Sequence, residues 1–245
     1  MEYILPVFFL FISFIYSSVG LGGGSSYTAI LAIMGISYKL IPTTSLTLNL
    51  VVTFIGMVNF WRKGHGRISL VAPFLITSIP MAYIAGALIF PEIIFQFILT
   101  TTLVLVAIRI FIFRDLAIKY ELSIIQRWIL TFCLGIILGF IAGAVGIGGG
   151  IYLVPLIILF GLGTTKEASA AGAMFIWANS MAGLIARYQY GTLEINFILP
   201  LIIAVIVGGF IGSYYGSVKY DTKTIQKIMG GIIIFAIILL IQRML

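Results

Sequence analysis

Apolar segments long enough to cross a lipid bilayer recur along the whole sequence, and no polar stretch between them is long enough for a soluble domain. Of the 245 residues, 62% are hydrophobic and 9% are charged, whereas charged residues make up about 25% of a typical soluble protein. A transmembrane helix needs about 20 apolar residues. The sequence therefore predicts an all-α polytopic membrane protein with a single membrane domain.

Two glycine clusters interrupt these apolar segments. The first reads VGLGGGSSYT and starts at Val19, and the second reads VGIGGGIYLV and starts at Val145. Adding 126 to the numbers of six glycines in the first half of the chain gives the number of a glycine in the second half. These six are Gly20, Gly22, Gly23, Gly24, Gly35 and Gly86. The coincidence indicates an internal duplication.

The duplication divides the chain into repeat 1, residues 1–119, and repeat 2, residues 120–245. In each repeat an apolar segment, 3–19 or 128–145, precedes the glycine cluster, and a shorter one, 25–37 or 151–163, follows it. The shorter segments reach only roughly 20 Å, less than the hydrocarbon core of about 30 Å. We therefore expect glycine-tipped helical hairpins at 3–37 and 128–163. Three longer helices follow in each repeat, at 42–61, 69–90 and 93–113 and at 167–187, 195–216 and 225–242.

The basic residues indicate how the hairpins lie in the membrane. If both hairpins are re-entrant, meaning that each enters and leaves on the same side, only Lys39, Arg187 and Arg243 lie on one face of the membrane. The opposite face then carries Arg62, Lys63, Arg67, Arg114, Lys119, Arg127, Lys166, Lys219, Lys223 and Lys227. If each pair of helices crosses once, the basic residues divide far more evenly. The positive-inside rule therefore favours re-entrant hairpins in the cytoplasmic (inner) membrane, with both termini outside. The repeats then have inverted topology, as in many secondary transporters.

Glycine tips inside a bilayer must be buried, because only protein or trapped water can satisfy their backbone polar groups. Hairpins of opposite topology would bring their tips together near the middle of the membrane. Each tip is followed by a helix start, and the N–H groups of a helix start bind anions. We therefore predict a binding site for a small anionic substrate between the tips. Its predicted residues are Gly22, Gly23, Gly24, Ser25, Ser26, Thr44, Ser45, Asn49, Gly148, Gly149, Gly150, Tyr152 and Asn179.

Several of these residues have a structural alternative. Thr44 and Ser45 follow Pro42 and are also suited to capping a helix. Asn49 and Asn179 each need either a partner on another helix or a ligand, because an unpaired amide is expensive in an apolar interior. Glycines spaced by four allow close helix packing. We assign to packing the series Gly135, Gly139 and Gly143 and the series Gly208, Gly212 and Gly216.

The residues that are absent also restrict the function. All seven acidic residues lie at the ends of predicted segments, which argues against a cation pump or a carboxylate-based antiporter. An enzyme or assembly factor would need a nucleophile with its base or a metal cluster. One His and the single Cys133 lie far apart in the chain, so we expect no metal, no cofactor and no enzymatic activity. We interpret Cys133 as a packing residue, and Arg109 and Arg187 as residues that extend to the membrane surface.

The expected partners are the anion and membrane lipid, with a homo-oligomer possible. The net charge of +7 first reports membrane orientation and does not imply a nucleic acid.

The segments GLGGGSSYTAILAIMGI…PTTSL and GIGGGIYLVPLIILFGLGTTKEASAAGA resemble the paired signatures of the TauE/SafE family, proposed exporters of sulfite and related organosulfur anions. The resemblance extends over both repeats in order. It implies a secondary transporter that exports sulfite, sulfoacetate or another sulfonate with the proton motive force. An anion channel of the same architecture, and uptake of another small anion, are the alternatives. A coupled proton would travel on the substrate, as bisulfite for example, or through a chain of Tyr or Ser hydroxyls.

Overall fold

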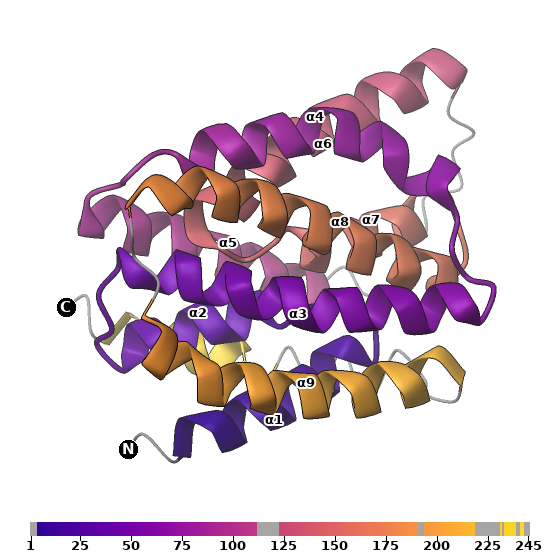
Figure 1. Cartoon of the computed structure of the whole chain (residues 1–245). Coiled ribbons are helices and arrows are strands. Elements are labelled where there is room, and N and C mark those ends of the chain that lie inside the picture. Colours follow the sequence, from indigo (N-terminus) through magenta and orange to yellow (C-terminus); the bar gives the residue numbers. More distant parts are fainter. Residues whose placement is uncertain are drawn as a thin grey trace.

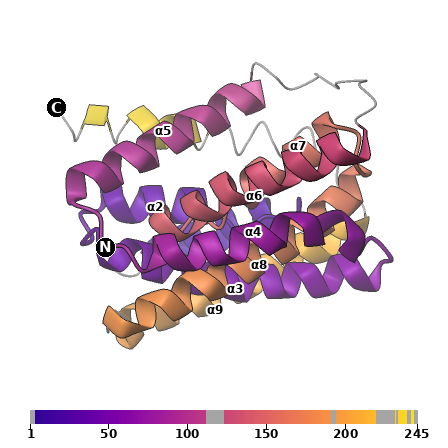
Figure 2. The same cartoon turned by 90° about the horizontal axis from the view of Figure 1, so that it is seen from above.

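The computed structural model describes residues 4–111, 123–190, 194–218, 231, 233–238 and 241–242. Across these residues the chain is helical and forms no strand. The helices lie side by side in one bundle (Figures 1 and 2). Their bounds are α1 Ile4–Ser17, α2 Gly24–Ile33, α3 Leu40–Arg62, α4 Ile68–Gly86, α5 Glu92–Phe111, α6 Ile124–Val145, α7 Gly150–Leu159, α8 Thr165–Arg187 and α9 Ile195–Val218, with a 3-10 turn, η1, at Tyr188–Tyr190.

Five helices are long and apolar enough to cross a membrane, namely α3, α4, α6, α8 and α9. The central pair is α3 and α8, whose most apolar windows are 61% and 67% buried, more than in the other three. α4 packs against α8 and α6, and α9 packs against α3 and α1. Large apolar side chains such as Phe8, Phe97 and Phe210 remain exposed on the outside of the bundle, as a lipid environment requires. The prediction of an all-α, multi-pass membrane protein is confirmed.

Glycines line the contact of α6 with α4 and the contact of α9 with α1. A Cβ atom added to Gly139 would lie 2.3 Å from the carbonyl oxygen of Ser78, and one added to Gly212 would lie 2.1 Å from that of Phe14. Real Cβ atoms do not approach other atoms this closely, so both contacts require glycine. The other members of the two series, Gly135, Gly143, Gly208 and Gly216, meet backbone atoms in the same way. Their predicted role in packing is confirmed.

The two short helices α2 and α7 have ten residues each, fewer than the predicted segments 25–37 and 151–163. Each ends before a glycine in the left-handed region, Gly35 with φ +79° and Gly161 with φ +60°. At the end of α2, the N–H group of Ile36 donates to the carbonyl oxygen of Leu31 over 3.1 Å, a bond typical of helices that end at glycine. At about 1.5 Å per residue, each helix extends only roughly half-way through the hydrocarbon core.

The ends of the longer helices differ from the predicted ones by a few residues. α6 begins at Ile124 rather than 128, because Ser123 and Gln126 form a capping box one turn earlier than the apolar run suggests. α4 ends at Gly86 rather than 90. The last predicted helix, 225–242, lies largely outside the described residues, and those described between 231 and 242 are helical.

Candidate functional site

The two glycine clusters meet inside the bundle, where α1 turns into α2 and α6 turns into α7. Gly23 and Gly149 precede the two short helices in the left-handed conformation, with φ +90° and +75°, which glycine adopts without strain. Neither helix start is capped by a side chain. A Cβ atom on Gly24 would lie 2.6 Å from the carbonyl oxygen of Ile147. The glycine turn between α1 and α2 and the one between α6 and α7, called here the first tip and the second tip, are therefore in direct contact.

Asn49 of α3 lies between the two tips. Its side chain is completely buried, and its Nδ2 donates to the carbonyl oxygen of Gly146 over 3.2 Å. A Cβ atom added to Gly22 or to Gly24 would lie 2.3 Å from the Asn49 amide group, so the same side chain also touches the first tip. Among the described residues its Oδ1 has no hydrogen-bond partner. Buried amide oxygens usually have one.

Ser45, one turn before Asn49 on α3, also joins the tips. Its hydroxyl lies 2.8 Å from the carbonyl oxygen of Gly146 in the second tip and 3.3 Å from that of Gly24 in the first. Thr28 Oγ1 of α2 lies 3.1 Å from the same hydroxyl. The carbonyl of Gly146 thus has two side-chain donors, Ser45 and Asn49. Thr44, the preceding residue, is buried on the same turn.

The first tip carries a cluster of hydroxyl groups. Tyr16 of α1 places its hydroxyl 2.7 Å from Ser26 Oγ, and Ser25 Oγ donates to Tyr16 over 3.2 Å. All three side chains are buried. The hydroxyls of Ser25 and Ser26, which were predicted to bind the anion, therefore form hydrogen bonds with α1 in this conformation.

The second tip is surrounded by apolar side chains. Cβ atoms added to Gly148 and Gly150 would lie 2.5 Å and 2.4 Å from Ile176, and one added to Gly149 would lie 2.9 Å from the ring of Phe175. The polar groups of the site thus belong mainly to the first tip and to α3.

Two predicted residues have their hydrogen bonds elsewhere. The Tyr152 hydroxyl donates to the carbonyl oxygen of Thr102 on α5 over 2.8 Å. Asn179 Nδ2 donates within α8, to the carbonyl oxygen of Phe175 over 2.8 Å. Asn179 is completely buried, and its Oδ1 has no partner in the part of the chain that the structure describes.

A cavity of about 190 Å³ lies where the end of α8 meets the start of α3, and it is lined by Arg187, Lys39, Pro42 and Ala144, among others. Arg187 is only 5% exposed, and its Nη2 donates to the carbonyl oxygens of Gly143 and Ala144 over 3.0 and 3.1 Å. The expectation that Arg187 extends to the membrane surface is wrong. The last turn of α6 ends inside the protein, and its carbonyl groups need donors there.

Sequence reasoning missed this contact, because the position of Arg187 at a helix end is equally typical of a surface residue. The interpretation of Cys133 as a packing residue is also wrong, since its side chain is exposed on α6. Arg109 lies on α5, and its side chain is outside the described part of the structure.

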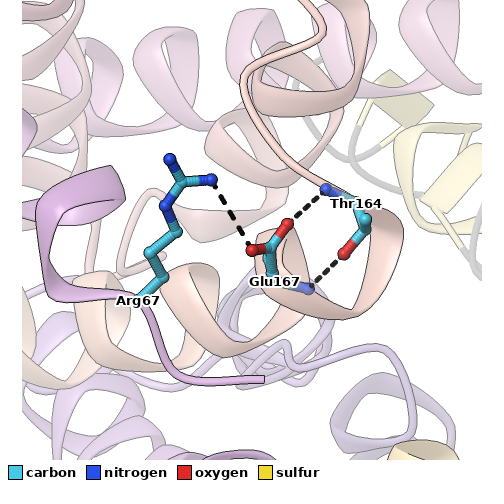
Figure 3. Close-up of polar contacts among 3 residues, drawn as sticks. All are labelled: Arg67, Thr164 and Glu167. Atoms are coloured by element: carbon cyan, nitrogen blue, oxygen red, sulfur yellow. Dashed lines mark hydrogen bonds and ion pairs between the residues drawn. The ribbon is translucent and has the colours of Figure 1, made fainter. Parts of the chain in front are cut away.

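The start of α8 carries an ionic contact to the start of α4 (Figure 3). Glu167 accepts a hydrogen bond from the N–H group of Thr164 over 2.7 Å, its own N–H group donates to Thr164 Oγ1 over 3.3 Å, and Arg67 lies 3.6 Å from its carboxylate. Arg67 therefore has an acidic partner. The contact also places the start of α8 beside the start of α4, at the opposite end of α8 from Arg187.

The chain was compared with known proteins. A family model described as sulfite exporter TauE/SafE matches residues 5–240. The chain is 31% identical over 227 residues to the probable membrane transporter protein y4hK of Sinorhizobium fredii (strain NBRC 101917 / NGR234), and the match covers 92% of both chains. It is 27% identical over 240 residues to the probable membrane transporter protein YjnA of Bacillus subtilis (strain 168), covering 92% of this chain and 94% of the relative. No solved structure matches the chain significantly.

Proposed function

Because the chain belongs to the TauE/SafE family of membrane transporters, whose role is sulfite export, we propose that it exports sulfite or a related sulfonate across the cytoplasmic membrane. The observation that carries the proposal is the contact of two helix starts, those of α2 and α7, inside an apolar bundle. Two such starts aim partial positive charge at one place. Binding of a small anion there needs no basic side chain.

The packing supports an inverted repeat in which α1 to α4 correspond to α6 to α9. Under this correspondence, the contact of α1 with α9 is equivalent to the contact of α6 with α4. The contact of α2 with α3 is likewise equivalent to that of α7 with α8. Individual contacts are equivalent as well. Gly24 lies against Asn49 of α3, and its counterpart Gly150 lies against Ile176 of α8. Within α3 and α8 the correspondence is a shift of 127, which pairs Asn49 with Ile176. The proposed boundary between residues 119 and 120 lies outside the described residues.

The two ends of the bundle differ in charge, which supports the proposed orientation. Five described basic residues lie at the end where α3 ends and where α4, α6 and α8 start: Arg62, Lys63, Arg67, Arg127 and Lys166. At the other end, the described basic residues are Lys39 and Arg187. The positive-inside rule places the first end in the cytoplasm and the second outside. Both termini are then outside, and both hairpins are re-entrant.

In the proposed mechanism the anion binds between the tips after they separate. Gly24 and Ile147 touch in the present conformation, so one repeat must move against the other to admit a solute, as alternating access requires. The freed N–H groups at the starts of α2 and α7, with the amide of Asn49, would then donate to the oxygens of the anion. Ser25 and Ser26 become donors only if they leave Tyr16.

We place the proton on the substrate, as bisulfite, so that it leaves the cell with the anion, and the membrane potential, rather than the pH gradient, drives export. No acidic residue is buried among the described residues, so a carboxylate relay at the tips is not available there. The cluster of Tyr16, Ser25 and Ser26 is the hydroxyl chain that the first tip offers. A tyrosine with an ordinary pKa of about 10 rarely gives up its proton near neutral pH, which makes the substrate the better carrier.

The test is sulfite counterflow in proteoliposomes, with sulfate, thiosulfate, sulfoacetate and acetate as competitors. The proposal predicts saturable exchange that is inhibited by sulfur oxyanions and that changes with pH as the bisulfite fraction changes. Flux that does not saturate and shows no counterflow would indicate a channel instead. Saturable exchange of acetate but not of any sulfur oxyanion would refute the proposed substrate class.

A further inference from the structure

We propose that the cavity at the end of α8 is a second anion-binding subsite, in which Arg187 and Lys39 hold the substrate between the outer surface and the glycine tips. This subsite is separate from the predicted site at the tips. Its place on the transport path rests on the proposed function, whereas its ability to bind an oxyanion does not.

The charge of the cavity favours an anion. Of the ten residues that line it, Lys39 and Arg187 are cationic and none is acidic. At the opposite end of α8, Arg67 forms an ion pair with Glu167, whereas Arg187 has no acidic partner among the described residues. A buried cation without a counter-ion is unfavourable, so a bound anion would supply the charge that the protein lacks here.

The hydrogen bonds of Arg187 leave part of its guanidinium unused. Nη2 donates to two carbonyl oxygens at the end of α6, whereas the buried Nε has no partner in the described structure. An oxyanion that reaches the Nε–H group would accept a charge-assisted hydrogen bond from it. Lys39 is exposed at the rim, where a flexible ammonium group can reach an anion that approaches from outside.

The cavity has the size and position of an intermediate binding site for a small anion. A volume of about 190 Å³ is far more than a single water needs and less than the roughly 300–1,000 Å³ of pockets for drug-sized ligands. Pro42 and Ala144 line its wall. A Cβ atom on Gly146 would lie 2.8 Å from the Cα of Pro42. One layer of residues therefore separates the cavity from the second tip.

The competing explanation is that Arg187 only caps the end of α6. Replacement by Gln distinguishes the two roles, because Gln keeps an amide donor for the carbonyl groups but removes the charge. A cap alone predicts a lower melting temperature with an unchanged KM for sulfite. A subsite predicts a higher KM even when the protein remains folded.

The experiment compares Arg187→Gln, Lys39→Gln and the control Lys63→Gln in sulfite counterflow, with melting temperatures of the purified proteins. We expect the first two variants to raise KM by about tenfold, as loss of a charge-assisted bond does, and the control to leave it unchanged. Lys39 and Lys63 are both exposed, so the comparison between them remains valid if Arg187→Gln does not fold. Equal KM values for Lys39→Gln, Arg187→Gln and the control would overturn the subsite and leave the proposed function intact.

Calorimetric titration with sulfite, sulfate and chloride tests the subsite without transport. If the wild type does not transport sulfite, the proposed function fails. Even in that case the subsite is supported if Arg187→Gln binds the oxyanion about tenfold more weakly than the wild type does. Absence of oxyanion binding to the wild type, or equal affinity in the wild type and Arg187→Gln, would refute it.

Discussion

The carbonyl group of Gly146 offers the sharpest test of how the tips are held together. Ser45 Oγ and Asn49 Nδ2 approach the same oxygen, at 2.8 and 3.2 Å. Replacement of either residue by Ala leaves the oxygen with one side-chain donor. Replacement of both removes the two side-chain donors from an oxygen in the interior of the bundle. The two substitutions should therefore not be additive.

The magnitudes follow from the bonds that are lost. A hydrogen bond between membrane helices contributes on average about 0.6 kcal/mol and at most about 1.7 kcal/mol, so Ser45→Ala and Asn49→Ala should each destabilise by roughly 0.5–1.5 kcal/mol. A buried group that is left without any partner costs about 1–3 kcal/mol. The double variant should thus exceed the sum of the single variants by about 1 kcal/mol.

The assay is the free energy of unfolding of the four proteins in mixed detergent micelles with increasing SDS. Thr47→Ala is the matched control, because Thr47 lies on the same helix and donates only to Thr43, over 2.8 Å within α3. Thr47→Ala combined with Asn49→Ala should be additive within about 0.5 kcal/mol. If Ser45→Ala and Asn49→Ala are equally additive, the two side chains do not share the Gly146 carbonyl, and our description of the tips is incorrect.

Three further predictions concern the tips and the distant cap. Gly24→Ala, whose Cβ would lie 2.3 Å from Asn49 and 2.6 Å from Ile147, should abolish counterflow while membrane insertion persists. Gly56→Ala, whose nearest contact would be 3.9 Å, should retain it, and equal activity of both would contradict close tip contact. Tyr16→Phe should keep the pH dependence of sulfite flux, because the proton travels on bisulfite, and a flux that becomes independent of pH would reassign the proton to the hydroxyl cluster. Thr164→Ala should lower the free energy of unfolding by about 0.5–2 kcal/mol through loss of the α8 cap, and a change in its KM for sulfite would contradict a purely structural role.

The membrane-spanning helices and the packing glycines were predictable from the sequence, because their physical causes are local. Apolar length determines a span, and the spacing of Gly208, Gly212 and Gly216 determines a face that another backbone can approach. The ends of α2 and α7 were less predictable. Gly35 and Gly161 appear in the repeat alignment, but only their left-handed conformation shows that they end the helices.

The candidate site was predictable as a set of residue types but not as a set of contacts. A buried amide such as Asn49 needs a partner, and the sequence does not reveal that this partner is Gly146, 97 positions away. The bond between Tyr16 and Ser26 was missed for the same reason, since it depends on how α1 lies against α2. Arg187 was misinterpreted because its burial depends on where α6 ends, which is a property of the assembled bundle.

The central claim is that the starts of α2 and α7 form one anion site in the middle of the membrane. An experimental structure of the protein with selenite, a heavier analogue of sulfite, tests it most directly through the anomalous signal of selenium. Our account predicts a selenium peak between the first and second tips, within hydrogen-bond distance of backbone N–H groups near Gly24 and Gly150. A selenium peak found only away from both tips, with Gly24 still in contact with Ile147, would contradict it.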